Sequence, residues 1–436
     1  MHRLQDQFFK QEDNSPLILF RILFGFLMAL ESFGAIATGW VKNNFVDTKM
    51  NFHFIGFDFL QALSGTHMYY HFLLMGCLAI MVMLGLWYRA AATGLAIFWT
   101  CAYLLQKTSY NNHYYLAMLL CWVMIFLPAA DDYSLDASRK KTRKTHVPQG
   151  IRWFFMLQLL IVFSFGSIAK LYPGWYHGDF IALAFNHRKH FPIIGPLLGN
   201  HHFQMFITYS GILFDGLIIP MLWWKKTRKI AFIGLLAFNL FNSVVFHIGI
   251  FPYMVIGITV FFFEPEGIQR LFFPKKYQRY AREIPRILPN FTLTLFVLYF
   301  LIQLGLPLRH HFIPGDVTWR EEGHRLSWRM MLRSKAGQLK LKVVDPKSGK
   351  TFPIRHSDHL SPKQARKVTY QPDFIWQYIQ FLKQDFADKG YPDVEIYAVK
   401  SKVWLNKEAP RSLIDSTVNL AEVKWNYWGR NEWVLD

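Results

Sequence analysis

Long apolar runs separated by short basic or polar stretches dominate the chain up to Leu308. Runs of this length and hydrophobicity predict membrane-spanning helices, although several are short for a hydrocarbon core of about 30 Å. About nine predicted spans result: Ser15–Thr38, Tyr69–Tyr88, Ala90–Gln106, Tyr114–Pro128, Ile151–Leu171, Gln204–Trp223, Ile230–Phe246, Gly249–Phe263 and Phe291–Leu308. We therefore expect a mainly α-helical, multispan transmembrane bundle over residues 1–308.

Residues 309–436 show shorter alternating runs and turn signals such as Asp345-Pro346 and Lys389-Gly390. The alternation predicts strands at Gln338–Val344, Glu395–Leu405 and Glu422–Trp428, and an amphipathic run predicts a helix over Pro372–Lys389. This part of the chain is expected to be a small extramembrane domain, either mixed α/β or rich in strands.

Composition and charge agree with a membrane protein. Hydrophobic residues make up 52% of the 436 residues, which excludes a wholly soluble enzyme and a disordered chain. The net charge of +19 comes from basic loops between the apolar runs and is accompanied by no nucleic-acid-binding motif. Four of these basic stretches lie on one side if the N-terminus is cytoplasmic: Arg89, 139–144, 225–229 and 270–286. The C-terminal region is then extracytoplasmic.

Ionisable side chains at apolar depth are costly and therefore point to function. Arg21, Glu31, Lys170 and Asp215 are such residues. Lys170 ends an apolar run and is followed by Leu171 and Tyr172, so desolvation would favour its neutral amine, which can act as a base. The alternative is an interfacial lysine that extends its amine to the head groups.

A polar run of seven residues, Lys107–His113, lies between two apolar runs on the predicted outer side. His113 and the neighbouring Asn111 and Asn112 could hydrogen-bond the oxygens of a small polar group, and a histidine can move a proton near neutral pH. The alternative is an ordinary polar loop between two helices.

Histidine pairs suggest a metal site, although histidines at the level of the lipid head groups are the favoured interpretation. His67 and His71 would share one helix face, as in the histidine boxes of di-iron enzymes. The chain has no HxxHH sequence and no acidic partners near these pairs, so no metal is expected.

Aromatic and methionine residues gather in two further stretches, Asn242–Tyr253 and Ser327–Met331. Flexible methionines and flat rings suit an apolar ring with a long tail, and Gly249 and Pro252 would break a helix beside a cavity. Both stretches could equally belong to the protein core.

Six of these segments together resemble the vitamin K-dependent γ-glutamyl carboxylases. In chain order they are Leu19–Met28, Leu84–Arg89, Lys107–His113, Ala169–Leu171 with Trp175, Phe246–Tyr253 and Ser327–Met331. The string Lys107-Thr108-Ser109-Tyr110-Asn111-Asn112-His113 is the most specific of them.

The resemblance implies a membrane enzyme that oxygenates reduced vitamin K (phylloquinol or menaquinol) to its epoxide with O2. The strong base formed in this reaction would remove a γ-proton from a peptide glutamate, and the carbanion would capture CO2. Lys170 matches the family's catalytic lysine, and His113 with Asn112 and Asn111 matches the residues that hold the quinone. The remaining positions that match its pocket are Phe246, His247, Gly249, Trp328, Met330 and Met331.

Ala169 stands where the animal enzymes carry a second lysine, and all three cysteines lie in apolar runs, so the family's disulfide has no counterpart. With the shorter chain, these departures favour a bacterial relative in the inner membrane, with its active face in the periplasm. In a eukaryote the corresponding face is the lumen of the endoplasmic reticulum. Expected partners are the bilayer, its quinone and a glutamate-containing peptide, and not nucleic acid. Three alternatives stay open: a hydroquinone epoxidase without carboxylation, a non-catalytic quinone- or lipid-binding protein, and a histidine-box metal oxygenase that would lose its iron when His67 and His71 are replaced.

Overall fold

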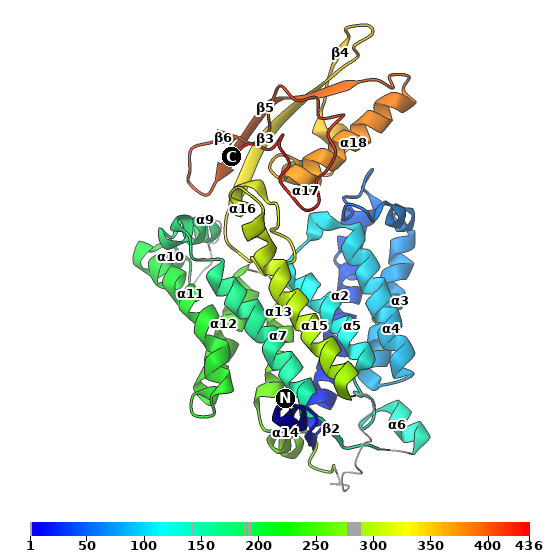
Figure 1. The fold of residues 1–436 in the computed structure, drawn as a ribbon, viewed down its shortest axis with the longest axis vertical. Helices are drawn as coiled ribbons and strands as arrows, with labels where there is room; N and C mark the ends of the chain where they lie inside the picture. The colour runs from blue at the N-terminus through cyan, green and yellow to red at the C-terminus, as the bar shows by residue number, and fades with distance from the viewer. Residues whose placement is uncertain (1, 142, 187–188, 191–193, 247, 277–288) are drawn as a thin grey trace.

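The computed structural model describes residues 2–141, 143–186, 189–190, 194–246, 248–276 and 289–436. A bundle of helices forms one end of the molecule, and a domain built on a four-stranded sheet stands at the other end (Figure 1). This architecture confirms the predicted fold class, a mainly helical membrane protein with a β-rich C-terminal domain. Helix α15 ends at Leu308, and the division of the chain into domains at that point stays a prediction.

All nine predicted spans are helical in the described part of the chain. The helices that correspond to them are α2 (Ser15–Ala37), α3 (His67–Leu84), α4 (Tyr88–Leu105), α5 (Asn112–Phe126), α7 (Gln149–Ile168), α11 (His201–Trp223), α12 (Arg228–Phe246), α13 (Phe251–Ile258) and α15 (Pro289–Leu308). Local signals explain several boundaries: Pro16 opens α2, the Asn111 side chain caps the Tyr114 amide at the start of α5, and Gly85, at φ +64°, ends α3.

Fewer of these helices can cross a bilayer than the sequence analysis counted. By length and composition, six helices among the described residues qualify, or seven if a bent pair is one span. Helix α5 is a short apolar helix of 15 residues, and α4 is long enough but not apolar enough. The predicted span Gly249–Phe263 is the bent element: α13 and the following 3-10 turn bend by 117° into α14 (Pro265–Phe272). Apolar character in the sequence predicts burial, and it does not separate a spanning helix from one buried among its neighbours.

Short elements close the lower end of the bundle in the view of Figure 1. Helix α1 (His2–Phe8) leads into strand β1 (Gln11–Asp13), which pairs antiparallel with β2 (His146–Pro148), and α6 (Leu135–Lys140) lies nearby. Lys276 donates to Asp13 at 2.7 Å and to the side chains of Asn14 and Ser15, so it ties the segment after α14 to the start of α2. Three small helices, α8 (Pro173–Tyr176), α9 (Asp179–Asn186) and α10 (Gly195–Gly199), lie at the opposite end of the bundle.

The C-terminal sheet has the order β4-β3-β5-β6 and is antiparallel throughout. Its strands are β3 (Lys335–Val344), β4 (Thr351–Pro353), β5 (Glu395–Leu405) and β6 (Arg411–Ser412), and its helices are α16 (Val317–Arg320), α17 (Pro362–Val368) and α18 (Pro372–Asp388). Leu339, Leu341 and Val343 of β3 pack against Phe374 and Tyr378 of α18 in one core. The predicted strands over β3 and β5 and the predicted helix over α18 are therefore confirmed.

The predicted strand Glu422–Trp428 is wrong. This segment carries no strand pairing, although Val423 and Trp425 alternate toward the core of the domain as the pattern implied. The Val423 carbonyl accepts a hydrogen bond from the Trp376 indole at 2.9 Å, and the Asn426 side chain bonds the Trp428 and Gly429 amides. Side chains therefore satisfy this backbone in place of a neighbouring strand.

The two ends of the molecule are joined by buried contacts. Phe52, between α2 and α3, packs against Phe374 of α18 with ring centroids 4.6 Å apart, and the Lys107 amine pairs with Asp373. The Leu326 amide donates to the Tyr110 hydroxyl at 2.7 Å. These contacts fix the C-terminal domain over the Lys107–His113 segment.

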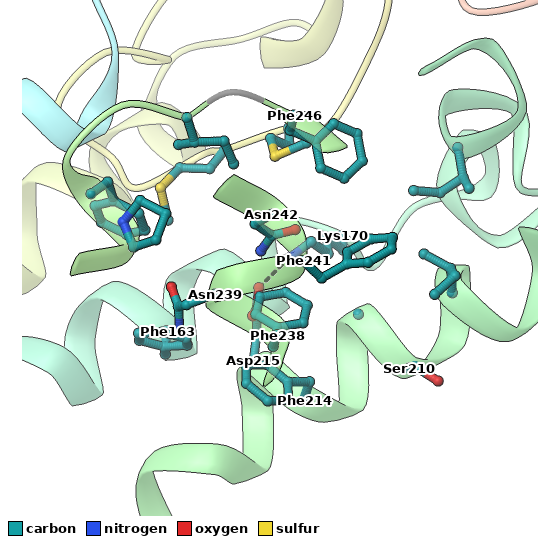
Figure 2. Close-up of a pocket in the computed structure, with 18 of the residues that line it drawn as sticks. Phe163, Lys170, Ser210, Phe214, Asp215, Phe238, Asn239, Phe241, Asn242 and Phe246 are labelled. Atoms are coloured by element: carbon teal, nitrogen blue, oxygen red, sulfur yellow. Dashed lines mark hydrogen bonds and ion pairs between the residues drawn. The ribbon is translucent and has the colours of Figure 1, made fainter. Parts of the chain in front are cut away.

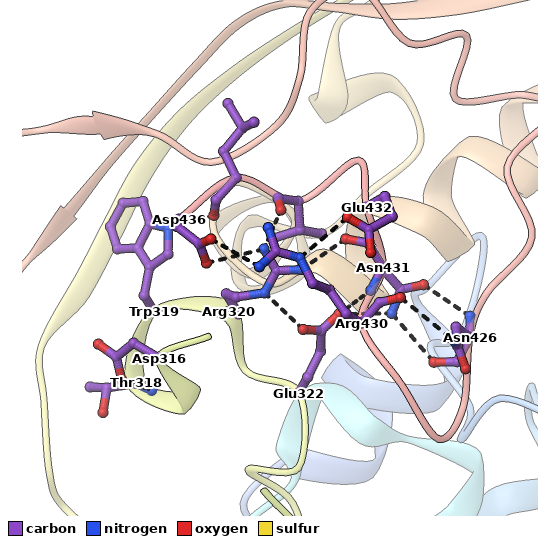
Figure 3. Close-up of polar contacts among 12 residues, drawn as sticks. Asp316, Thr318, Trp319, Arg320, Glu322, Asn426, Arg430, Asn431, Glu432 and Asp436 are labelled. Atoms are coloured by element: carbon purple, nitrogen blue, oxygen red, sulfur yellow. Dashed lines mark hydrogen bonds and ion pairs between the residues drawn. The ribbon is translucent and has the colours of Figure 1, made fainter. Parts of the chain in front are cut away.

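A second network ties residues 431–436 to the loop that follows α16 (Figure 3). Arg320, 1% exposed, donates from Nε to Glu322 at 2.9 Å and from Nη2 to the Asn431 carbonyl at 2.8 Å, and its Nη1 bonds the Val434 carbonyl. The Asn431 amide in turn donates to Glu322 at 2.8 Å. The loop carrying Ser327–Met331 therefore begins at a rigid point.

Candidate functional site

Lys170 lies two residues beyond the end of α7, in a turn that Pro173 prevents from continuing as a helix. Its amine forms an ion pair with Asp215 of α11 and lies 5.4 Å from the centre of the Trp175 ring. Lys170 and Asp215 are each less than a tenth exposed. Two opposite charges this deeply buried are costly to separate, so the pair holds α7 and α11 together where they meet.

The pair forms part of the wall of an apolar cavity of about 180 Å³. Seven phenylalanine side chains form part of the wall: Phe163, Phe180, Phe214, Phe238, Phe241, Phe246 and Phe251. Figure 2 shows Lys170 and Asp215 joined beside these rings, with the amides of Asn239 and Asn242 from α12 nearby. A mainly apolar cavity with a few polar groups in one place is typical of a site for a small ligand with polar ends.

His113 lies on the wall of the same cavity. Its ring stacks on Phe251, with centroids 4.0 Å apart and an angle of 20° between the ring planes. The His113 side chain makes no hydrogen bond with another described residue, so its ring nitrogens are available to a ligand. The stacking contact brings the first turns of α5 and α13 together at the cavity.

The predicted residues of the Phe246–Tyr253 stretch are placed as follows. Phe246 lies on the cavity wall and stacks on Phe185. Gly249 has φ +64°, a conformation that favours glycine, and its turn leads into Phe251 and Pro252, which also line the cavity. His247 lies outside the described residues.

The loop from Leu326 to Met331 is unusual in its backbone. Leu326, Trp328 and Met331 have φ values of 59°, 56° and 48° although none is glycine. Such conformations cost about 1–3 kcal/mol each and gather at functional sites. Met330 and Met331 line the cavity, whereas Trp328 lies behind it, fully buried against Tyr115 with ring centroids 4.9 Å apart.

A second cavity of about 210 Å³, here called the basic chamber, shares His113, Met330 and Met331 with the first. Its wall also carries four cations and no acidic residue among those described: Lys107, Arg325, Arg329 and Lys367. Asn111 and Asn112 line the basic chamber and not the apolar cavity. The Asn112 amide donates to the Arg329 carbonyl at 3.0 Å, so this asparagine connects α5 to the strained loop.

The charges of the basic chamber are only partly compensated. Lys107 and Arg325 both pair with Asp373, which lies behind the wall. Burial tends to raise the pKa of Asp373, but Arg325 and Lys107 hold it below its usual value. Arg329 and Lys367 form no ion pair with a described residue, and burial lowers the pKa of Lys367 to about 8 and that of Arg329 to about 10. The chamber therefore favours an anion.

The side chains that could bind a metal ion do not gather at one point in the described part of the chain. The described residues contain no group of three or more His, Cys, Asp or Glu side chains that could hold a metal ion. His71 of the candidate pair bonds the Phe98 carbonyl at 2.8 Å, and His67 is exposed.

Sequence reasoning missed several residues of this region. Asp215 was noted as an ionisable residue at apolar depth, yet its pairing with Lys170, 45 residues away, needs the packing of α7 on α11. Asn239 and Asn242 are three residues apart on α12 and therefore share one face of that helix. This spacing is a weak sequence signal for two polar residues that line one cavity. Arg329 lies within the Ser327–Met331 stretch but was not itself singled out, and Lys367 carried no signal beyond its charge.

Comparison with known proteins covers nearly the whole chain. Residues 9–266 match the HTTM domain, and residues 288–436 match the lumenal domain of vitamin K-dependent gamma-carboxylase. No solved structure matches the chain. The two matches follow each other along the chain: the first covers the bundle from α2 to the start of α14, and the second covers α15 and the C-terminal domain. The chain therefore belongs to the vitamin K-dependent gamma-carboxylase family.

Proposed function

We propose that this protein oxidises a reduced naphthoquinone, vitamin K hydroquinone or menaquinol, with O2 and couples this reaction to carboxylation of peptide glutamate with CO2. One observation carries the proposal. The Lys170–Asp215 pair lies on the wall of an apolar cavity, and that cavity shares His113, Met330 and Met331 with a basic chamber. One space suits an apolar ring, and the adjoining space suits a carboxylate.

Lys170 is the proposed base that removes a proton from the hydroquinone. The Lys170 amine can pass its own proton to the Asp215 carboxylate and then accept one from a hydroquinone hydroxyl at Nζ. Reduced vitamin K supplies the reducing equivalents and, with O2, the strong base that the glutamate γ-proton requires. No metal is needed in this proposal.

His113 is the proposed ligand of a quinone oxygen. Its ring is held flat against Phe251, and its nitrogens bond no described side chain, so one of them can donate to the quinone. Phe246 and the two shared methionines would then contact the ring and tail, and Gly249 would shape the turn beside them. Asn111, Asn112 and Trp328 would act by positioning α5 and the strained loop.

The basic chamber is the proposed site of the acceptor glutamate. Arg329 and Lys367 form no ion pair with a described residue, so a carboxylate in the chamber would compensate them. A carbanion must be kept from water, and Met330 and Met331, just before the first strand of the C-terminal sheet, form part of the wall of both cavities.

The proposal includes an orientation. The basic loops 139–144 and 225–229 would face the cytoplasm, which leaves the C-terminal domain and both cavities in the periplasm of a bacterium or in the lumen of the endoplasmic reticulum. The quinone would enter from the bilayer, and a glutamate-containing peptide would enter from the aqueous side.

The test uses purified protein in detergent with chemically reduced vitamin K, O2, labelled bicarbonate and a glutamate peptide. Epoxide and carboxylated product are measured for the wild type, for Lys170→Ala and for Lys226→Ala, an exposed lysine as control. We expect Lys170→Ala to lose about 10²- to 10⁴-fold of both products and the control to lose neither. Epoxide without carboxylated product would support an epoxidase alone. Equal background from all three proteins would leave a quinone-binding role.

A further inference from the structure

One face of the C-terminal sheet carries a group of exposed lysines. Lys340 and Lys342 lie on β3, and Lys400 and Lys402 lie on the neighbouring β5. Their strand neighbours Leu339, Leu341 and Val403 face the core on the other side of the sheet. These four residues are here called the lysine face.

The charges of the lysine face are not paired: Glu395, on the same face of the sheet, accepts a hydrogen bond from the Tyr397 hydroxyl and forms no ion pair with any of the four lysines. Lys340 lies directly opposite Lys400 in the pairing of β3 with β5, and like charges in that position destabilise a sheet. None of the four amines forms an ion pair with a described residue. Lys342 lies 5.9 Å from the centre of the Tyr397 ring, and Lys402 lies opposite Gln338 on one side and Ser412 on the other. An anionic partner would remove this repulsion.

The position of the lysine face relates it to the candidate site. The Tyr172 hydroxyl, two residues from Lys170, donates to the Leu332 carbonyl just before β3 begins. From Leu332 the chain runs along β3 to Lys340, a distance of roughly 26 Å at about 3.3 Å per residue. The strand thus leads away from the cavities, at the end of the molecule opposite β1 and β2 (Figure 1).

We propose that the lysine face docks an acidic stretch of the polypeptide whose glutamate enters the basic chamber. This inference rests on the proposed function for the identity of the partner. An extended peptide covers the same distance with about eight residues, so the docked acidic stretch lies about eight or more residues from the modified glutamate. Lipid head groups are the less suitable anion, because the strands point away from the helical bundle.

Docking of this kind has a distinct physical signature. Attraction between an acidic peptide and four exposed lysines raises the association rate and weakens as salt screens it, since the screening length falls from about 10 Å at 0.1 M to about 3 Å at 1 M. Contacts of the glutamate inside the basic chamber are more buried and respond less to salt.

The experiment measures binding of a fluorescent peptide to the full chain in detergent by anisotropy. The peptide carries one glutamate and, ten residues away, a block of six glutamates; a matched peptide carries six glutamines in the block. The variant replaces all four lysines (Lys340→Gln, Lys342→Gln, Lys400→Gln, Lys402→Gln). The control replaces four exposed lysines at the other end of the molecule (Lys140→Gln, Lys141→Gln, Lys226→Gln, Lys229→Gln).

We expect the lysine-face variant to bind the acidic peptide about tenfold or more weakly at low salt, and the control to bind it within about twofold of the wild type. The difference should vanish at 1 M salt and with the glutamine peptide. Equal binding by the variant and the wild type overturns the inference. So does lysine-dependent binding to anionic phospholipid vesicles when the acidic peptide does not compete.

Two further measurements keep the result clear. The variant should unfold at the same or a higher temperature than the wild type, because the Lys340–Lys400 repulsion is removed, so weaker binding would not reflect misfolding. Carboxylation of the peptide is assayed separately. Peptide docking without carboxylation would count against the proposed function and would leave the docking inference standing. Equal carboxylation of the peptide by the wild type and the lysine-face variant would support the proposed function and count against the docking inference.

Discussion

The Arg320 network offers a sharp test of what holds the site loop. Replacing Arg320 by Met leaves the Glu322 carboxylate, which is 5% exposed, without its cation, and leaves the Asn431 and Val434 carbonyls without a donor. Breaking a buried charge pair by removing one partner costs about 3–5 kcal/mol. At about 4 °C per kcal/mol for a domain of this size, the C-terminal domain should unfold about 12–20 °C earlier.

The assay is thermal unfolding of the full chain in detergent, combined with hydrogen exchange to localise the change to residues 319–333. Arg430→Met is the matched control, because the partners of Arg430 are exposed: Glu432 is 82% exposed and Asp436 is 58% exposed. Such a pair is worth about 0–1 kcal/mol. Adding Glu322→Gln to Arg320→Met should recover part of the loss, since the unpaired charge is then gone. If Arg320→Met and Arg430→Met lower the unfolding temperature by the same amount, the reasoning is refuted.

Four further outcomes are expected. Asp215→Asn removes the ion-pair partner of Lys170, so reductive methylation of Lys170, followed by mass spectrometry, should speed up at least about tenfold because the carboxylate no longer holds the amine; an unchanged rate would contradict this. Because burial lowers the pKa of Lys367 to about 8, the chamber loses a positive charge above that pH, and the KM for a glutamate peptide should rise by up to about tenfold per pH unit in the wild type but not in Lys367→Met. Gly249→Ala, at φ +64°, should cost about 1–2 kcal/mol and raise the KM for reduced quinone, whereas Gly234→Ala, with open space around it, should not. Phe251→Ala removes the stacking partner of His113 and should raise the same KM about 3- to 10-fold, in contrast to the exposed Phe206→Ala.

The helical part of the fold was predictable because apolar runs report burial directly. All nine predicted spans are helices, and β5 has the bounds that alternation predicted. The number of membrane crossings was overestimated because hydropathy does not show whether an apolar helix is surrounded by lipid or by other helices. Helix α5 and the bent α13 are examples. Glu422–Trp428 has the alternation of a strand, but strand formation also needs a neighbour, which a single segment does not report.

The candidate site was predictable only in part, and for a similar reason. Lys170 and His113 were identified from two short segments, Ala169–Leu171 and Lys107–His113, that can each be recognised without knowledge of the fold. Both residues lie on the wall of one cavity. Asn111 and Asn112 belong to the same string, yet helix capping and the loop contact turn them toward the basic chamber. Asp215 completes the Lys170 pair from another helix, and no local pattern encodes a contact between residues 45 positions apart.

The Lys170–Asp215 pair also bears on how the chain enters a membrane. Asp215 lies within α11, and an aspartate near the middle of a spanning helix costs about 2.5–3.5 kcal/mol during insertion. Lys170 precedes it in the chain, so the cation has already been synthesised when α11 reaches the insertion machinery. Lateral release of α11 into lipid would then be favoured once it meets α7. The residues proposed for proton transfer would thus also lower the cost of placing α11 in the membrane.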